Sequence, residues 1–143
     1  MEVIARKKTG VGIMYLVCTF FGLTIFGMGI SDEIIIVGLL GLVLSIISGY
    51  IFFDYVSLPY DVIKVDTEGN LHLPKSIVIP LRDITDISYR RASAKGIQYK
   101  WGSVTMRTHL EKFKYGYIRN CEDVAKQLTE MMHRAKFENP KKN

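Results

Sequence analysis

Two long runs without a charged residue limit what this chain can fold into more than any other feature. They cover residues 11–30 and 34–53, and only Ser31, Asp32 and Glu33 lie between them. A helix rises about 1.5 Å per residue, so about twenty residues cross the ~30 Å hydrocarbon core of a bilayer. We therefore expect a two-helix transmembrane hairpin over residues 11–53.

A signal peptide and a soluble helical hairpin both fit these runs less well. A signal peptide has an apolar region of about 7–15 residues and a cleavage site with small residues. The first run is longer than that, and a second run follows it at once. A soluble helical hairpin would carry a polar stripe on each helix, and neither run has one. The sequence therefore favours membrane-spanning helices.

Basic residues near the runs indicate the orientation of the hairpin. Arg6, Lys7 and Lys8 precede the first run, the turn between the runs has no basic residue, and Lys64 follows the second run. Lys and Arg next to spans mark the cytoplasmic side. We expect a multi-pass protein of the cell membrane with cytoplasmic N- and C-termini, in which residues 1–10 are a basic N-terminal segment.

Small residues recur at four-residue spacing in both runs, where they let helix backbones approach closely in lipid. This ridge either packs the two helices of one hairpin or forms a seam between two copies of the chain. No ionisable residue lies within either run, so transport by this chain alone is not expected. The candidate packing residues are Cys18, Gly22, Gly41, Ser45 and Gly49.

The apolar periodicity changes to two after the second run, which is typical of strands. We expect about six short antiparallel strands between residues 61 and 118, with Gly102 interrupting one of them. Asn120 is a candidate N-cap for an amphipathic helix whose apolar stripe is Val124, Leu128, Met131 and Ala135. The prediction is an α+β soluble domain over residues 55–136, a curled antiparallel sheet or small barrel covered by that helix, and a frayed tail over residues 137–143.

Short motifs in this part carry a resemblance to a known family. They are Ile63–Asp66 with Gly69-Asn70-Leu71, then Ile79-Pro80-Leu81-Arg82-Asp83-Ile84, then Gly102-Ser103-Val104, and finally residues 117–125, YIRNCEDVA. This pattern resembles the bacterial pleckstrin-homology-like domains of small membrane proteins, which a two-helix hairpin often precedes. The resemblance implies a partly open β-barrel capped by a C-terminal helix. It implies no enzymatic chemistry and does not by itself imply phosphoinositide binding.

The region from residue 90 to residue 119 is strongly basic: eight Lys and Arg stand against the single acidic residue Glu111. Each basic residue near an anionic leaflet contributes about 1 kcal/mol of binding. The alternative is an ordinary solvated face of a sheet. Nucleic acid is not expected, and the interleaved aromatic residues are expected in the core. The candidate residues for binding a headgroup or a partner are Arg90, Arg91, Lys95, Lys100, Arg107, Lys112 and Lys114.

Nothing in the sequence indicates catalysis. It contains no glycine-rich phosphate loop and no nucleophile or zinc-protease motif, and His72, His109 and His133 lack metal-ligand spacing. We therefore expect no enzyme activity, cofactor or metal. Two hypotheses remain. One is a membrane-anchored binding or scaffold module that contacts anionic lipids or a protein partner. The other is an accessory membrane subunit or bacteriocin-type self-immunity factor, acting through the hairpin as a homo-oligomer or with a partner.

Overall fold

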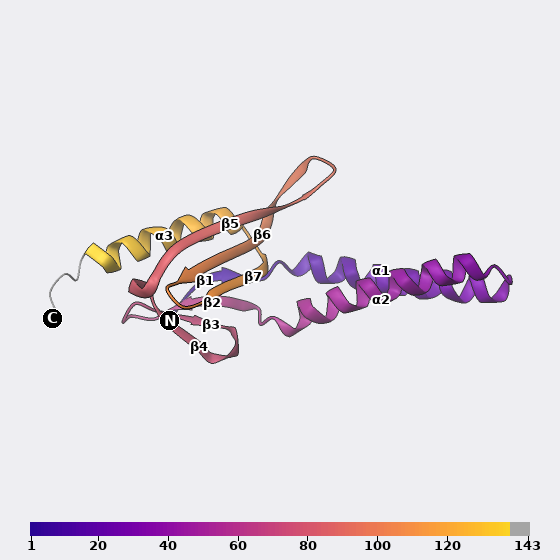
Figure 1. Cartoon of the computed structure of the whole chain (residues 1–143), viewed down its shortest axis with the longest axis horizontal. Coiled ribbons are helices and arrows are strands. Elements are labelled where there is room, and N and C mark those ends of the chain that lie inside the picture. The colour runs from indigo at the N-terminus through magenta and orange to yellow at the C-terminus, as the bar shows by residue number, and fades with distance from the viewer. Residues whose placement is uncertain (138–143) are drawn as a thin grey trace. The chain divides into compact units, whose positions relative to one another are not determined.

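The computed structural model describes residues 1–137 and divides the chain into two units (Figure 1). One unit, the hairpin unit, is Thr9–Leu58. The other, the β unit, is made of Met1–Lys8 and the chain from Pro59 onward. The hairpin unit is thus inserted into the sequence of the β unit. The frayed tail predicted for residues 137–143 lies outside the described residues, apart from Phe137.

The hairpin unit consists of two helices, α1 (Thr9–Ser31) and α2 (Ile35–Ser57), each of 23 residues. Such a helix is about 34 Å long, and both helices are apolar enough to cross a membrane. Their large apolar side chains point outward, whereas the buried positions of α2 are mostly glycine and serine. This distribution is the reverse of a soluble hairpin and suits a surface that faces lipid.

Small residues bring the two helix backbones together. A Cβ atom added to Gly22 would lie 2.8 Å from the backbone nitrogen of Ser45, and one added to Gly41 would lie 2.5 Å from that of Phe26. These contacts are too short for any side chain, so the residues Gly22, Gly41 and Ser45 pack within one hairpin. Gly49 makes only ordinary contact, at 3.7 Å from a methyl group of Thr19. Cys18 is half-buried.

The β unit contains two antiparallel sheets and one long helix. The first sheet has the order β1-β2-β3-β4 and the second β5-β6-β7. The described residues do not form a closed barrel. The strands are β1 (Glu2–Arg6), β2 (Asp61–Val65), β3 (Asn70–Leu73), β4 (Ile77–Pro80), β5 (Ile84–Ala94), β6 (Ile97–Thr108) and β7 (Lys112–Ile118), with 3₁₀ turns at Pro74–Ser76 and Leu81–Asp83.

Strand β1 was not predicted. It pairs with β2 across the inserted hairpin, and Ala5 is fully buried while Ile4 is 8% exposed. The N-terminal segment therefore supplies part of the core of the β unit. Five residues next to a long apolar run are too few to show a period of two, and their partner strand lies more than fifty residues away in the sequence.

Gly102 does not interrupt a strand, contrary to the prediction. Strand β6 is continuous, and Gly102 pairs with Arg91 on β5 and with Ile118 on β7. A Cβ atom at this position would lie 2.1 Å from the carbonyl oxygen of Arg90. The glycine therefore allows a close approach of neighbouring strands, which is the other common reason for glycine within a strand.

Helix α3 (Cys121–Phe137) packs against β5 and β6 (Figure 1). Its buried face is Cys121, Val124, Ala125, Leu128 and Met132, so Met132 and not Met131 completes the stripe. Asn120 has a φ of 50°. Asn120 holds the predicted position directly before the helix, and its carbonyl oxygen accepts from the N–H of Val124 at 3.1 Å. Its left-handed backbone differs from the extended conformation typical of a side-chain N-cap. The side chain of Lys136 donates to the carbonyl oxygen of Ile84 at 2.7 Å.

Candidate functional site

Four of the seven predicted binding residues share one face of the second sheet. Arg107 pairs with Lys112 on one side and with Asp86 on the other, Thr105 pairs with Lys114, and Ser103 pairs with Arg90. Because side chains alternate along a strand, these positions project from the same side. Arg90, Arg107, Lys112 and Lys114 are all exposed. We call this the basic face.

The basic face places like charges next to each other. Arg107 and Lys112 are directly opposite residues on neighbouring strands, an arrangement that destabilises a sheet. Asp86, opposite Arg107 on its other side, is the one acidic residue in these rows. An anion bound on this face would relieve the remaining repulsion.

Arg91 differs from the other predicted binding residues. It forms an ion pair with Glu122 on α3, and Lys126 binds the same carboxylate at 3.0 Å. Arg91 thus fastens α3 to β5. Its guanidinium is already paired with a carboxylate, so it is less available to an external anion than the residues of the basic face.

A hollow of about 460 Å³ lies at one end of the second sheet, lined by Lys8, Tyr99, Lys100, Trp101, Arg119 and Asn120. Backbone hydrogen bonds join the segments around it: the N–H of Lys8 donates to Tyr117 at 2.8 Å, and the N–H of Arg119 donates to Arg6 at 3.0 Å. We call it the basic hollow. Among the described residues, neither Lys100 nor Arg119 forms an ion pair.

The sequence prediction missed Lys8 and Arg119 as site residues. Lys8 was assigned to a separate N-terminal segment, and only the pairing of that segment with β7 brings it to the hollow. Arg119 follows β7 directly and belongs to the basic region by sequence. Its position next to Lys8 depends on the same long-range pairing, so the sequence contains no local signal for it.

Aromatic rings line the hollow and the neighbouring surface. The ring centroids of Tyr99 and Trp101 are 6.1 Å apart, and those of Trp101 and Tyr117 are 6.5 Å apart and stacked. A second hollow of about 390 Å³ lies beside Trp101 and includes Arg90 and Lys114 of the basic face. The expectation that the aromatics lie in the core is wrong for Tyr89 and Tyr99, which are 43% and 40% exposed.

The remaining predicted residues, Lys95 and Lys100, lie on a hairpin that extends from the sheet. Lys95 is in the turn between β5 and β6, with a φ of 47°, and Gly96 follows with a φ of 82°. Residues 93–100 are all exposed. The structure therefore places the seven predicted residues in three groups: the basic face, the extended hairpin, and the ion pair of Arg91.

Two titratable groups of the β unit have a structural role. The backbone N–H groups of Glu68 and Asn70 donate to Asp66 at 2.9 Å, and the His72 ring lies 3.0 Å from the same carboxylate. These contacts hold the pKa of Asp66 well below its usual range. Burial raises the pKa of Cys121, so its thiol stays protonated at neutral pH and is a packed core group.

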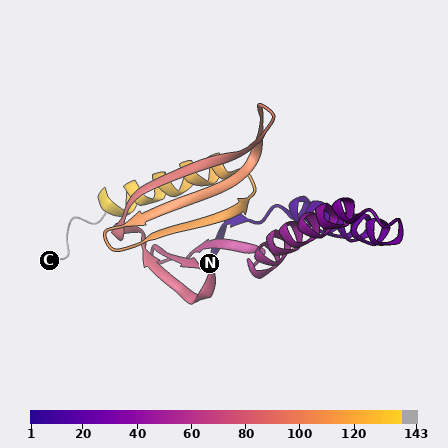
Figure 2. The ribbon, with the colours of Figure 1, turned by 45° about the vertical axis from the view of Figure 1, so that its right-hand side comes forward.

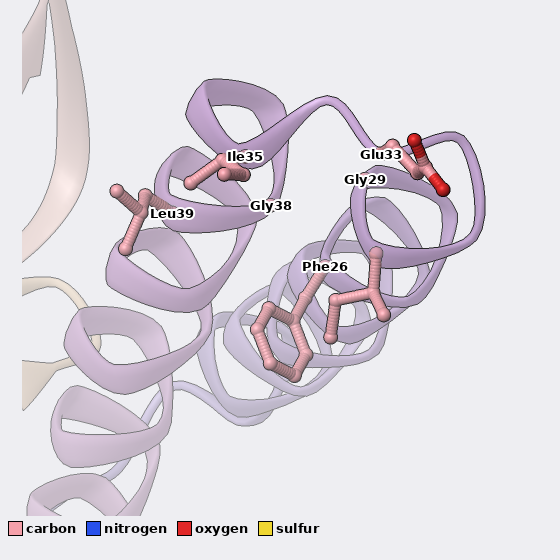
Figure 3. A pocket seen from close by; sticks show the side chains of 7 residues that line it. Phe26, Gly29, Glu33, Ile35, Gly38 and Leu39 are labelled. Carbon is pink, nitrogen blue, oxygen red and sulfur yellow. The ribbon is translucent and has the colours of Figure 1, made fainter.

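The hairpin unit has its own hollow, of about 500 Å³, beside the turn (Figure 3). Gly29 and Gly38 bring the backbones together there, since a Cβ atom on Gly29 would lie 2.2 Å from the nitrogen of Gly38. Glu33 is the one ionisable residue of the lining, and the others are apolar or glycine. One carboxylate at the end of an apolar groove does not make a binding site.

The fold defines a class of architecture: a helical hairpin, long and apolar enough to cross a membrane, inserted into an α+β unit of two antiparallel sheets and a helix. Comparison of the chain with protein-family models, with curated proteins and with solved structures found no match. Residues 1–137 contain no group of three or more His, Cys, Asp or Glu that could hold a metal ion.

Proposed function

We propose that this chain is a non-enzymatic, membrane-anchored binding module whose β unit contacts anionic lipid headgroups on the cytoplasmic side of the cell membrane. Two antiparallel sheets followed by a helix are compatible with the pleckstrin-homology-like resemblance, and the binding role rests on the charge of the β unit. Among the described residues, neither the four residues of the basic face nor Lys100 and Arg119 of the basic hollow form an ion pair, so their positive charge supports this binding role.

One observation carries the proposal: the basic hollow includes Lys8, and Lys8 is bonded to Thr9, the first residue of α1. If α1 spans the bilayer, Lys8 must lie at the level of the headgroups, whatever angle the hairpin takes. Lys8 therefore fixes the position of the hollow, and Lys100 and Arg119 provide its charge. Tyr99 and Trp101 are the residue types that favour the membrane interface.

The energetics favour binding without a specific ligand. Each Lys or Arg close to an anionic leaflet contributes about 1 kcal/mol, and this contribution falls off within a Debye length of about 8 Å at physiological salt. Tethering keeps the hollow within that distance. Lys100 and Arg119 together with two residues of the basic face would hold the β unit against the headgroups by roughly 3–4 kcal/mol.

Trp101 gives a direct test because it is the only tryptophan in the chain and lines the basic hollow. The full chain is placed in nanodiscs of phosphatidylcholine, alone or mixed with phosphatidylglycerol. We expect Trp101 emission to shift to shorter wavelength in the anionic discs, and the shift to shrink at high salt. The double variant Lys100→Gln with Arg119→Gln should lose most of it.

The matched control replaces two exposed basic residues outside the hollow and the basic face, Arg82→Gln with Arg134→Gln. This variant changes net charge by the same amount and should keep the full shift. Identical Trp101 emission in neutral and anionic discs, at low salt and with folded protein, would overturn the proposal. If both double variants lost the Trp101 shift equally, the shift would depend on net charge and not on the basic hollow.

The other hypothesis, an accessory subunit or self-immunity factor acting through the hairpin, has less support. Gly22, Gly41 and Ser45 are buried against the partner helix of the same hairpin. They are therefore not free to form a seam with another protein. A partner would have to bind the large apolar side chains on the outer faces of α1 and α2.

A further inference from the structure

The hairpin between β5 and β6 extends beyond the rest of its sheet (Figures 1 and 2). The last residue pair that joins β6 to β7 at this end is Gly102 with Ile118. Residues 97–101 of β6 continue past that pair, with Ala94 opposite Ile97 and Ser93 opposite Gln98 on β5. We call residues 93–101 the arm.

The arm ends in a tight hairpin turn, and the register of β5 and β6 shifts at its base, between Arg91 and Ser93. Its two turn residues, Lys95 and Gly96, both have positive φ, at 47° and 82°, as a tight two-residue hairpin turn requires. Every residue from 93 to 100 is exposed. A two-stranded hairpin alone is only marginally stable in water, so a contact that orders the arm would be favourable.

The composition of the arm fits an anionic, partly apolar environment. No acidic residue occurs between Ile87 and Leu110. Ile97 is 61% exposed beside the turn, and Tyr99 is 40% exposed further along the strand. Lys95 and Lys100 place a positive charge on either side of Ile97. An exposed isoleucine beside a basic turn, followed along the strand by Tyr and Trp, has the residue types of a membrane interface.

The position of the arm follows from the basic hollow at its base. Tyr99, Lys100 and Trp101 line that hollow together with Lys8, which precedes α1 directly. The arm from Gly102 to its turn is about 20 Å long at ~3.3 Å per residue. The headgroup layer is only about 5–8 Å thick on each side of the bilayer. An arm that starts at the headgroups is thus long enough to lie along them or to enter them.

We propose that the arm docks into the anionic leaflet, with Ile97 at the boundary of the acyl chains and Lys95 and Lys100 on lipid phosphates. This inference rests on the proposed function and names the element that performs it. The occupant is a lipid surface and not a second copy of the chain, because the arm carries charge of one sign and two arms would repel each other.

The test moves the single tryptophan to the tip. Trp101→Phe with Ile97→Trp is reconstituted at one chain per nanodisc, in phosphatidylcholine and phosphatidylglycerol whose acyl chains carry bromine. The control is Trp101→Phe with Leu110→Trp. Leu110 is 95% exposed and lies between β6 and β7, at the other end of the sheet. Circular dichroism checks that both variants keep the fold of the parent chain.

We expect the tryptophan at position 97 to emit at shorter wavelength and to be quenched by brominated chains, and the one at position 110 to show neither. Equal quenching at the two positions would overturn the arm as the docking element. So would a shift at position 97 that appears only with several chains per disc, since the arm would then bind another copy.

The same measurements distinguish a failure of docking by the arm from a failure of the proposed headgroup binding. If Trp101 of the unmodified chain responds to phosphatidylglycerol but the tryptophan at position 97 is not quenched, the proposed docking of the arm is wrong. Headgroup binding by the β unit is then still supported. If position 97 is quenched equally in neutral and anionic discs, the arm inserts but the preference for anionic lipid fails. A further variant, Ile97→Glu in the unmodified chain, should reduce the Trp101 shift several-fold.

Discussion

At the scale of single residues, Asp66 is the residue that most clearly links geometry to a measurable quantity. The side-chain amide of Asn70 adds a contact at 3.1 Å to the backbone donors and the His72 ring around this carboxylate. All of them favour the ionised form, which explains the direction of the pKa shift. Asp66 therefore stabilises the turn between β2 and β3 only while it is charged.

We predict that Asp66 makes the β unit sensitive to acid. Because folding lowers the pKa of Asp66, its stabilising effect is complete above the ordinary value of about 3.9 and is lost as the pH falls through and below it. Thermal unfolding of wild type and Asp66→Asn should differ at neutral pH and converge toward pH ~2. Asp83→Asn is the control, and a constant difference at all pH values would contradict this role of Asp66.

At the scale of helices, substitutions at two glycines of α1 distinguish the effect of helix packing on stability from the effect of helix propensity. Gly22→Ala inserts a methyl group within 3 Å of the α2 backbone, whereas the space around Gly27 is open. We expect Gly22→Ala to destabilise the hairpin by about 1–3 kcal/mol through overpacking. Gly27→Ala should be neutral or stabilise it by up to about 1 kcal/mol. Unfolding by SDS titration in mixed micelles measures both, and equal effects would refute the close contact.

At the scale of strands, β1 is expected to be indispensable. The N–H of Lys7 donates to the carbonyl oxygen of Tyr60 at 2.9 Å, so a short Gly/Ser linker from residue 8 to residue 59 can replace the whole hairpin. We predict that this linked chain folds cooperatively and that residues 55–143 alone do not. In the linked chain, Ile4→Ala should cost about 2–4 kcal/mol, and Glu2→Ala almost nothing.

The outcome of that comparison is read by chemical denaturation. If residues 55–143 alone unfold at the same denaturant concentration as the linked chain, β1 contributes nothing to the stability of the β unit and the prediction is wrong. A fragment that starts after the hairpin is also unsuitable for binding studies, since it lacks the buried residues Ile4 and Ala5.

The elements that sequence analysis predicted well are those with a local signal. The two apolar runs, the alternating strand at Lys112–Ile118 and the amphipathic helix α3 all follow from periodicity within one segment. What it missed depends on contacts between distant segments: β1, the close approach at Gly102, and the meeting of Lys8 with Arg119. The predicted binding residues were therefore selected from the basic composition of one segment and not from their positions in the fold. That selection could not separate Arg91, which pairs with Glu122 of α3, from the basic face.

At the scale of the whole molecule, the pairing of β1 with β2 restricts the topology. These strands precede and follow the hairpin, so the two outer ends of a spanning hairpin must be on the same side of the membrane. In the proposed orientation, the basic residues before α1 put that side in the cytoplasm. The proposed anchor and the basic surface thus belong to one chain. Lys8 lines the basic hollow and is bonded to Thr9, the first residue of α1.

We predict the consequence for accessibility in sealed vesicles. A membrane-impermeant thiol reagent on the cytoplasmic side should label cysteines placed at Glu2 and at Lys75. The same reagent on the other side should label one placed at Asp32. All three probes are introduced in a chain whose own cysteines, Cys18 and Cys121, are replaced. Labelling of positions 2 and 75 from opposite sides would contradict the pairing of β1 with β2 in the membrane.

Hydrogen–deuterium exchange of the full chain in nanodiscs tests the central claim most directly, because it reports on each segment of the β unit separately. We predict slower exchange in anionic than in neutral discs over residues 95–101, which comprise the turn of the arm and the part of β6 that lacks a β7 partner. The turn at residues 67–70 should exchange equally in both. Identical exchange over residues 95–101 in the two lipids would contradict the claim that this surface binds anionic headgroups.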